Sequence, residues 1–238
     1  HHHMGFHRFY DTWFEQLHHL VHQLTKAPRP PATQEDHHHL QALVRKVMTH
    51  YDEFYRVKSL AAKHDVLSVF SAPWCTSLER SLHWIAGWRP TTAFHLIYTE
   101  SSILFESRIV EILRGLRTGD LGDLSPAQFS RVSELQCETV QEENAITDEL
   151  SQWQACITIS AVSVDAGDIV GTSVNVDAKI EGLVMVVAKA DELRLKTIRR
   201  VVDLLTPQQA VEFLIAAAQL QFGIRGWGSD HDRQRENP

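Results

Sequence analysis

Apolar residues recur at steps of three and four over most of this chain of 238 residues, and this spacing is the strongest constraint on its fold. Over residues 6–24 it places one apolar stripe along an amphipathic helix. The same spacing returns over residues 40–69, 126–153 and 180–205, and a last helix is expected after Pro207. The pattern predicts an all-α fold, a single bundle of about six to seven helices built from antiparallel helical hairpins.

Capping residues and prolines mark several helix boundaries. In three segments a hydroxyl residue lies three positions before Glu or Gln, which is the pattern of a capping box. These segments are Thr76–Glu79, Ser125–Gln128 and Thr206–Gln209. The last two segments also carry proline at the first helical position. Three prolines predict a mobile linker over residues 28–36. Local propensity predicts strand or loop over residues 155–178, which are rich in β-branched residues and glycine.

The expected domain spans residues 6–226 and is followed by a flexible tail over residues 227–238. His1–His3 precede Met4 and look like the remnant of a purification tag, so they are set aside.

The helix after Pro90 is predicted to end before Gly119 and to bury eight apolar side chains, namely Phe94, Ile97, Leu104, Phe105, Ile109, Ile112, Leu113 and Leu116.

Composition excludes several classes of function. The formal charge of −7 argues against direct binding of nucleic acid, because affinity for phosphates comes mainly from clustered lysine and arginine. Cys75, Cys137 and Cys156 lack the spacing of a metal site or a disulfide framework, which favours reduced thiols inside the cell. No uncharged apolar run reaches about 18 residues, so no transmembrane segment is expected.

Short catalytic, phosphate-binding and zinc-hydrolase motifs are absent from the sequence, so we expect neither an enzyme nor a metal site nor a cofactor. The i,i+4 spacing of His18 and His22 is compatible with zinc or haem. With no cysteine ligand nearby, a solvated helix face is the favoured interpretation of these two histidines.

An acidic band marks the helix predicted from residue 126 and the loop before it. Its members are Asp120, Asp123, Glu142, Glu143, Asp148 and Glu149. Such a band is usually a solvated face, but it can also steer a basic partner protein. We take this band as the candidate partner site. Reversing the charges of Glu142, Glu143 and Glu149 is then expected to weaken partner capture without unfolding the protein.

Three tryptophans, Trp74, Trp84 and Trp88, gather before Arg89 and Pro90. Indole rings supply a large apolar area and one directed donor, which suits core packing and equally a partner groove or an apolar ligand. Core packing is favoured for Trp84 and Trp88, with Arg89 bracing a helix end or an acidic residue.

The segment Trp84-Ile85-Ala86-Gly87-Trp88-Arg89-Pro90 resembles the signature of the plant delay-of-germination domain, which is also found in TGA-type bZIP factors. The resemblance continues through Gly119–Gln128, Asp191–Arg194 and Leu205–Ala210. It implies an all-α domain in which residues 155–178 form a variable connector outside the core, with a short hairpin allowed there. Unlike the TGA factors, this chain has no basic region and leucine heptads before the domain.

The resemblance implies a non-catalytic plant adaptor that gathers other proteins, and overall similarity favours a role in pollen-aperture formation. A seed-dormancy or transcription-related regulator of phosphatases or bZIP partners is the first alternative. A sensor that binds haem or an acyl chain in the bundle is the second. Partners are expected to be basic or membrane-associated proteins, and self-association stays open. The expected location is the cytoplasm, with recruitment to the plasma membrane, and the nucleus is the alternative.

Overall fold

Eight α-helices and one 3-10 turn make up the part of the chain described by this computed structural model, residues 2–163 and 169–237. The all-α prediction is confirmed, and the count exceeds the expected six to seven because two of the helices have only five residues. The elements are α1 (His2–Lys26), α2 (Gln34–Ser71), α3 (Ser77–Ser81), α4 (Thr92–Ser107), α5 (Ile109–Leu113), η1 (Leu121–Asp123), α6 (Pro126–Ser163), α7 (Ile169–Leu204) and α8 (Pro207–Glu236).

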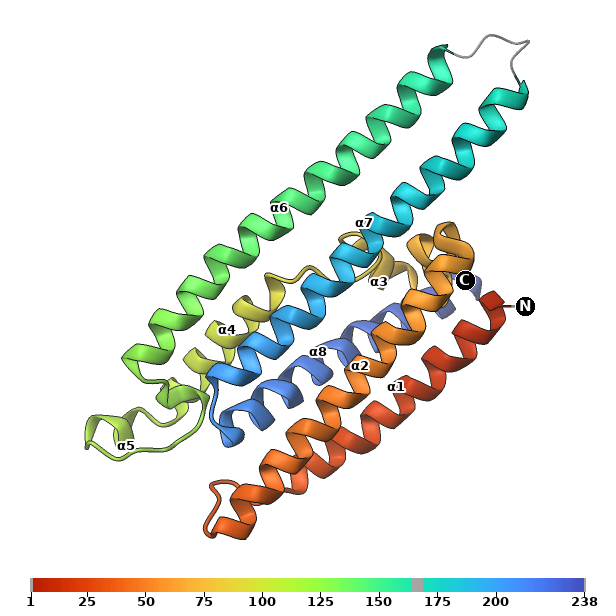
Figure 1. The fold of residues 1–238 in the computed structure, drawn as a ribbon. Coiled ribbons are helices and arrows are strands. Elements are labelled where there is room, and N and C mark those ends of the chain that lie inside the picture. The colour runs from red at the N-terminus through yellow and green to blue at the C-terminus, as the bar shows by residue number, and fades with distance from the viewer. Residues whose placement is uncertain (1, 164–168, 238) are drawn as a thin grey trace.

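Two long hairpins build the bundle, α1 with α2 and α6 with α7 (Figure 1). Helix α8 packs against α1, α2, α3 and α4, and α7 packs against α2. The apolar stripe of α1 is buried as predicted, with Trp13, Leu17 and Leu24 inside the core. Both ends of the chain lie at one end of the bundle, whereas α5 and the start of α6 lie at the other (Figure 1).

All three predicted capping boxes are present. The N–H of Glu79 donates to the Thr76 hydroxyl at 3.2 Å, and the N–H of Gln209 donates to the Thr206 hydroxyl at 3.2 Å. The N–H of Gln128 reaches the Ser125 hydroxyl at 3.1 Å. These bonds satisfy amide groups that a helix leaves unpaired at its start.

The two proline-containing helix starts also bind each other. The side-chain amide of Gln128 donates to the side-chain oxygen of Gln209 at 2.7 Å and to the carbonyl of Leu204 at 3.1 Å. Gln209 in turn donates to the carbonyl of Asp120 at 3.2 Å. The first turns of α6 and α8, far apart in sequence, are therefore fixed against each other and against the turn that precedes α6.

The predicted connector over residues 155–178 is largely helical, so the expectation of strand, loop or hairpin is wrong for its described part. Helix α6 continues to Ser163 and α7 begins at Ile169, while residues 164–168 lie outside the described residues. The Trp153 indole donates to the carbonyl of Lys179 at 2.6 Å, which joins the two helices near the base of this extension. Pairing between the helices overrides the strand propensity of the β-branched residues.

The linker and the tail also differ from prediction. Helix α2 begins at Gln34, inside the predicted linker 28–36, because Thr33 caps it by accepting from the N–H of Asp36 at 3.1 Å. The predicted tail 227–238 is helical as far as Glu236. It is also held in place, because the Asp232 carboxylate accepts from both the N–H and the hydroxyl of Ser77.

Helix α8 carries a half-buried acid close to the turn before α6. Glu212 accepts from the N–H of Leu121 at 2.9 Å. Burial raises the pKa of Glu212 to about 7, and the nearby carboxylate of Asp120 adds to this rise, although the bond from Leu121 opposes it. The folded protein therefore binds a proton more readily at Glu212 than the unfolded chain does.

This shift predicts a fall in stability as pH rises from the ordinary value of 4.5 to about 7, because within that range the folded state keeps a proton that the unfolded chain has lost. We expect Glu212→Gln to remove most of the fall and to stabilise the fold by about 2 kcal/mol above pH 7. The full shift would correspond to roughly 3 kcal/mol. Urea unfolding at pH 5 and pH 8 measures the effect. Glu15→Gln, at an exposed position on α1, is the control, and equal pH profiles for the two variants would contradict the prediction.

Candidate protein-interaction surface

The signature loop Trp84–Pro90 has a backbone that most residues avoid. Ile85 and Ala86 have φ values of 42° and 62°, in the left-handed region, and the N–H of Trp84 donates to the carbonyl of Gly87 at 2.7 Å. Left-handed backbone costs free energy in a non-glycine residue and persists only where the surroundings fix it. The loop must therefore be held from outside.

Arg194 of α7 holds the loop. Its side chain is fully buried, and its guanidinium donates to the carbonyl of Trp88 at 2.7 Å and to the carbonyls of Trp84 and Ile85. It lies so close to Gly87 that a Cβ there would come within 3.0 Å of the guanidinium carbon. Residue 87 is therefore glycine because the arginine occupies the space of a side chain.

Lys58 of α2 and Asp191 of α7 complete this support. The Lys58 ammonium, 4% exposed, donates to the carbonyl of Ala86 at 2.7 Å and to Asp191 at 2.9 Å, and the same Asp191 oxygen accepts from Arg194 at 2.6 Å. Buried charges are stable only when paired and hydrogen-bonded, as all three are here. Lys58 was not predicted from the sequence, but it continues the buried stripe of Tyr51 and Tyr55, where a lysine is unusual.

Arg89 and Glu143 fix the other end of the loop. Glu143, only 3% exposed, accepts from the Arg89 side chain at 2.7 Å and from the N–H of Thr91 at 2.8 Å. Pro90 and Thr91 lead into α4, so the carboxylate of Glu143 holds the start of that helix. Arg89 thus braces an acidic residue, one of the two arrangements considered from the sequence.

The three tryptophans all contact the interior. The Trp84 indole donates to the Thr147 hydroxyl at 2.9 Å, and the Trp88 indole donates to the Tyr55 hydroxyl at 2.9 Å. Trp74 is 7% exposed and meets the ring of Phe6 edge-on, with centroids 4.4 Å apart. The indole donors of Trp84 and Trp88 are used within the chain, and Trp74 packs on Phe6, so these residues join this region to α6, α2 and α1.

The acidic band is dispersed by the fold. Asp120 and Glu143 are buried at 4% and 3% exposure, so neither can contact a partner in this structure. Asp123 pairs with Arg117 at 3.1 Å, Glu142 with Lys196 at 2.5 Å and Glu149 with Lys189 at 2.8 Å. Asp148 is exposed. The expected harmless charge reversal therefore fails for Glu143, because it would place a lysine where Arg89 and the N–H of Thr91 need an anion.

The two histidines with i,i+4 spacing lie on an exposed face of α1. The His18 ring stacks on Phe222 of α8, with centroids 3.6 Å apart and planes 11° apart. Burial against this neighbour lowers the pKa of His18. His18 therefore contributes to the contact between α1 and α8.

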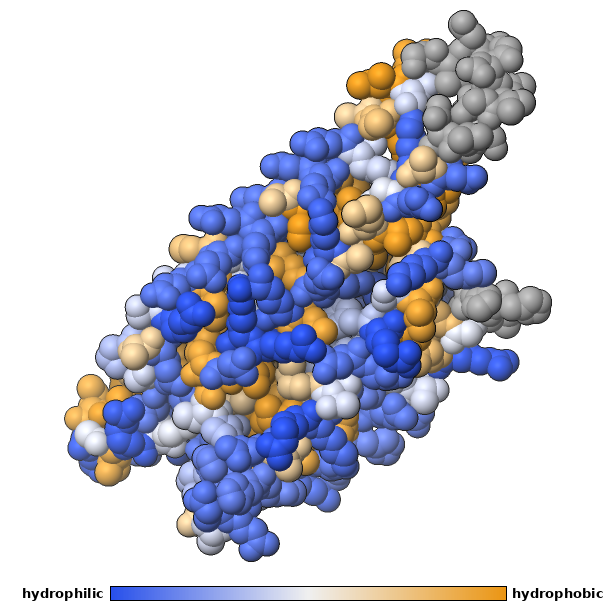
Figure 2. All heavy atoms as spheres, viewed as in Figure 1, coloured by the Kyte–Doolittle hydropathy of each residue, from blue (hydrophilic) through white to orange (hydrophobic). Residues whose placement is uncertain are grey.

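An exposed apolar surface occupies the end of the molecule that α5 forms. We call it the 103–116 surface, and its side chains are 41–77% exposed at Ile103, Phe105, Ile109, Val110, Leu113 and Leu116. Figure 2 shows hydrophobic residues gathered at this end of the bundle. Apolar groups that cluster on the surface of a folded protein mark interaction sites more often than scattered ones do.

The 103–116 surface contradicts part of the predicted core. Phe94 and Ile97 are fully buried as expected, but Phe105, Ile109, Leu113 and Leu116 are not. For Ile109, Leu113 and Leu116 the reason is local, because α4 ends at Ser107 and Arg108 has a non-helical backbone, with φ −117° and ψ 15°. The apolar stripe cannot continue through that break, so the residues beyond it leave the core.

Comparison with known proteins finds a matching family and relatives in plants. A family model described as seed dormancy control, DOG1, matches residues 16–99. Protein DOG1-like 4 of Arabidopsis thaliana is 33% identical, over 93% of this chain and 90% of that protein. Protein DOG1-like 3 of the same plant is 28% identical, over 95% and 84%. Transcription factor HBP-1b(c1) of Triticum aestivum is 28% identical over 92% of this chain but only 43% of its own length.

The two DOG1-like proteins match along most of their length, whereas the wheat factor extends well beyond the matched part. The signature loop, its buried support and the paired helix starts all lie within the region that these relatives share. On this similarity and on its all-α fold, the chain belongs to the DOG1 family.

Proposed function

We propose that this chain is a non-catalytic adaptor that binds another protein through the 103–116 surface. The observation that carries the proposal is the exposure of apolar side chains in and around a helix of five residues, up to 77% at Leu113. Covering them would remove apolar area from water, at about 25 cal/mol for each Å² buried. Membership of a family of regulators supports the same role.

The charges at the carboxyl end of the surface favour an acidic flank on the partner. Arg114 and Arg117 are both exposed at its carboxyl end, and Arg117 is only partly neutralised by Asp123, because its side chain remains 75% exposed. Rim charges of this kind raise association rates and select partners more than they add affinity. The proposed partner segment is therefore apolar with neighbouring acidic residues, rather than basic as the acidic band predicted.

Paired substitutions at the surface test the proposal. We expect Val110→Glu with Leu113→Glu to reduce capture of partners at least tenfold while leaving the melting temperature unchanged, because both side chains are mostly exposed. Proximity labelling with the intact chain identifies the partners, and pulldowns with purified variants give the ratio. Leu60→Glu with Leu67→Glu, at 55% and 53% exposure on α2, is the matched control. Equal losses for both pairs, or no loss for the first, would refute this surface.

For the biological process, we propose pollen-aperture formation, which rests on overall sequence similarity alone. The description of the matching family, seed dormancy control, supports the competing process. Expression in developing anthers and in maturing seeds discriminates between them, and detection only in seeds would overturn the pollen assignment.

The proposed location is the cytoplasm, with recruitment to the plasma membrane. A fluorescent fusion of the intact chain would test this location against the nucleus. Within the residues that the structure describes, none of the helices is long and apolar enough to cross a membrane.

The haem or acyl-chain sensor is the second candidate, because the structure contains an aromatic cavity. Its volume is about 150 Å³. Pockets for drug-sized ligands usually hold about 300–1,000 Å³. The cavity is therefore small for haem or a long acyl chain, and absorbance spectra of the protein after haem addition would test this directly.

A further inference from the structure

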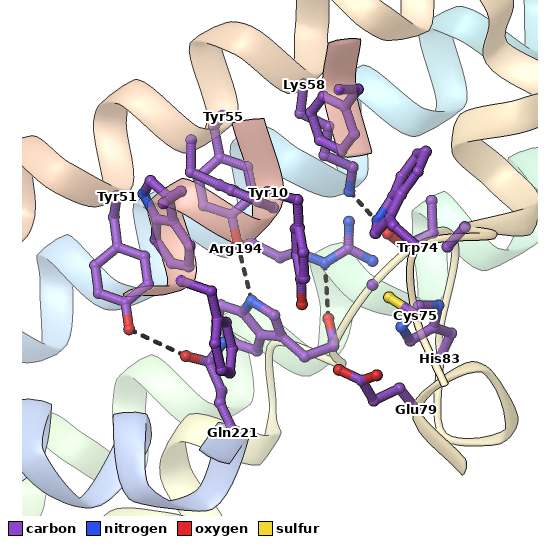
Figure 3. Close-up of a pocket in the computed structure, with 18 of the residues that line it drawn as sticks. Tyr10, Tyr51, Tyr55, Lys58, Trp74, Cys75, Glu79, His83, Arg194 and Gln221 are labelled. Atoms are coloured by element: carbon purple, nitrogen blue, oxygen red, sulfur yellow. Dashed lines mark hydrogen bonds between the residues drawn. The ribbon is translucent and has the colours of Figure 1, made fainter. Parts of the chain in front are cut away.

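The aromatic cavity lies between α1, α2, α8 and the signature loop. Its walls carry the rings of Tyr10, Trp13, Phe54, Trp74 and Trp88 among others. Figure 3 shows Tyr10 in the middle of this group, between α2 residues and the loop. Aromatic walls favour another ring, because offset and edge-on ring contacts add about 0.5–1.5 kcal/mol to the burial of area. A volume of about 150 Å³ matches a single six-membered ring, since an apolar cavity of that size admits benzene.

One side of the cavity is polar. Cys75, Glu79 and His83 gather there, on the side to which the Tyr10 ring points its hydroxyl (Figure 3). Burial raises the pKa of the Cys75 thiol to about 12 and lowers the pKa of His83 to about 4. Burial also raises the pKa of Tyr10. At neutral pH these three groups are uncharged. The Tyr10 and Cys75 side chains hydrogen-bond each other, and with His83 they form a polar side without a net charge.

The charged groups around the cavity are balanced within the protein. Glu79 accepts from the N–H of Thr76 at 2.6 Å and lies 3.5 Å from Arg225. Lys58 and Arg194 are held by Asp191 and by carbonyls of the signature loop. A charged ligand would have to compete with these bonds, and burying a charge without a partner is costly. A neutral ligand avoids that cost.

We infer that this cavity binds a small neutral aromatic molecule of one ring with a hydroxyl substituent, with the ring among the aromatic walls and the hydroxyl facing Tyr10, Cys75 and His83. Such a molecule would bridge α1, α2, α8 and the signature loop, and would stabilise the folded state by mass action. The site is separate from the 103–116 surface, so this inference stands independently of the proposed adaptor function.

Phenol is the probe, and toluene and benzoate are its comparisons. In spectra of the labelled protein, phenol is expected to shift the indole N–H signals of Trp13, Trp74 and Trp88 and to leave that of Trp153, which binds Lys179, unchanged. Phenol is also expected to raise the melting temperature in proportion to the logarithm of its concentration once the site is saturated. Toluene is expected to bind more weakly than phenol, and benzoate more weakly than both.

Two variants locate the site. Ile224→Trp fills the cavity from α8 and is expected to weaken phenol binding at least tenfold, whereas Leu220→Trp, one turn earlier and outside the lining, keeps it. Tyr10→Phe removes only the hydroxyl and is expected to cancel the preference for phenol over toluene without weakening toluene. Absence of phenol binding to the natural chain would overturn the inference, as would a folded Ile224→Trp variant that binds normally. Stronger binding of benzoate than of phenol would overturn the neutral class of ligand.

Discussion

Replacing Arg194 by methionine is expected to lower the free energy of unfolding by about 3–5 kcal/mol, the usual cost of removing one partner from a buried charged network. The side chain is 0% exposed and donates to three loop carbonyls and to Asp191. Methionine is of similar length but donates nothing, so those carbonyls lose their partner while the left-handed residues Ile85 and Ala86 lose their support. In a domain of this size the melting temperature should fall by roughly 6–20 °C.

Arg199→Met on the same helix is the matched control for Arg194→Met. Its side chain is 53% exposed and pairs with Asp52 at the surface, so its loss should cost less than about 1 kcal/mol. Thermal melts and urea titrations of both variants measure the difference. Similar changes in the two variants would show that the signature loop does not depend on the buried guanidinium.

Gly228→Ala is expected to destabilise the fold by about 3 kcal/mol or more, at or beyond the upper end of ordinary overpacking. A Cβ at this position would lie 2.1 Å from the Thr76 hydroxyl oxygen and 2.7 Å from its Cβ. Thr76 cannot turn away freely, because its hydroxyl accepts from the N–H of Glu79 in the capping box of α3. Helices α3 and α8 must therefore separate, which also strains the hydrogen bonds between Ser77 and Asp232.

Gly226→Ala, two residues earlier on α8, should have the opposite effect. A Cβ there meets nothing within 4 Å, and alanine in a helix interior is more stable than glycine by about 0.5–1 kcal/mol. Chemical unfolding of the two variants gives the comparison. A Gly228→Ala protein as stable as Gly226→Ala would mean that the end of α8 is not packed against α3.

Local features of this fold could be predicted from the sequence, because their partners lie within a few residues. The three capping boxes depend on residues three positions apart, and the apolar stripes of α1 and α2 repeat at helical spacing. The all-α class follows from that spacing. The bridge between Gln128 and Gln209 could not be predicted in the same way, since each side chain also satisfies its own helix start.

Features that depend on distant segments were missed. Charged residues are mostly exposed in proteins, so the burial of Lys58, Glu143 and Asp120 runs against their residue type. Lys58 and Glu143 are buried where α2 and α6 meet the signature loop, and Asp120 is buried where the turn before α6 meets α8. Helix α6 extends through β-branched residues because α7 runs beside it. The 103–116 residues have the spacing of a buried helix face, but whether anything covers such a face is decided by the rest of the bundle.

The positions of the chain ends bear on how this domain can be attached to other molecules. Helix α8 begins beside the turn that precedes α6 and ends against α3, and Arg225 of α8 lies 3.4 Å from Asp11 of α1. Its 30 residues span about 45 Å at 1.5 Å per residue. A tether joined to either end of the chain would therefore lie far from the 103–116 surface (Figure 1). The bundle therefore acts as a rigid spacer. When this chain is fused or immobilised at either terminus, the 103–116 surface stays accessible at a fixed distance from the point of attachment.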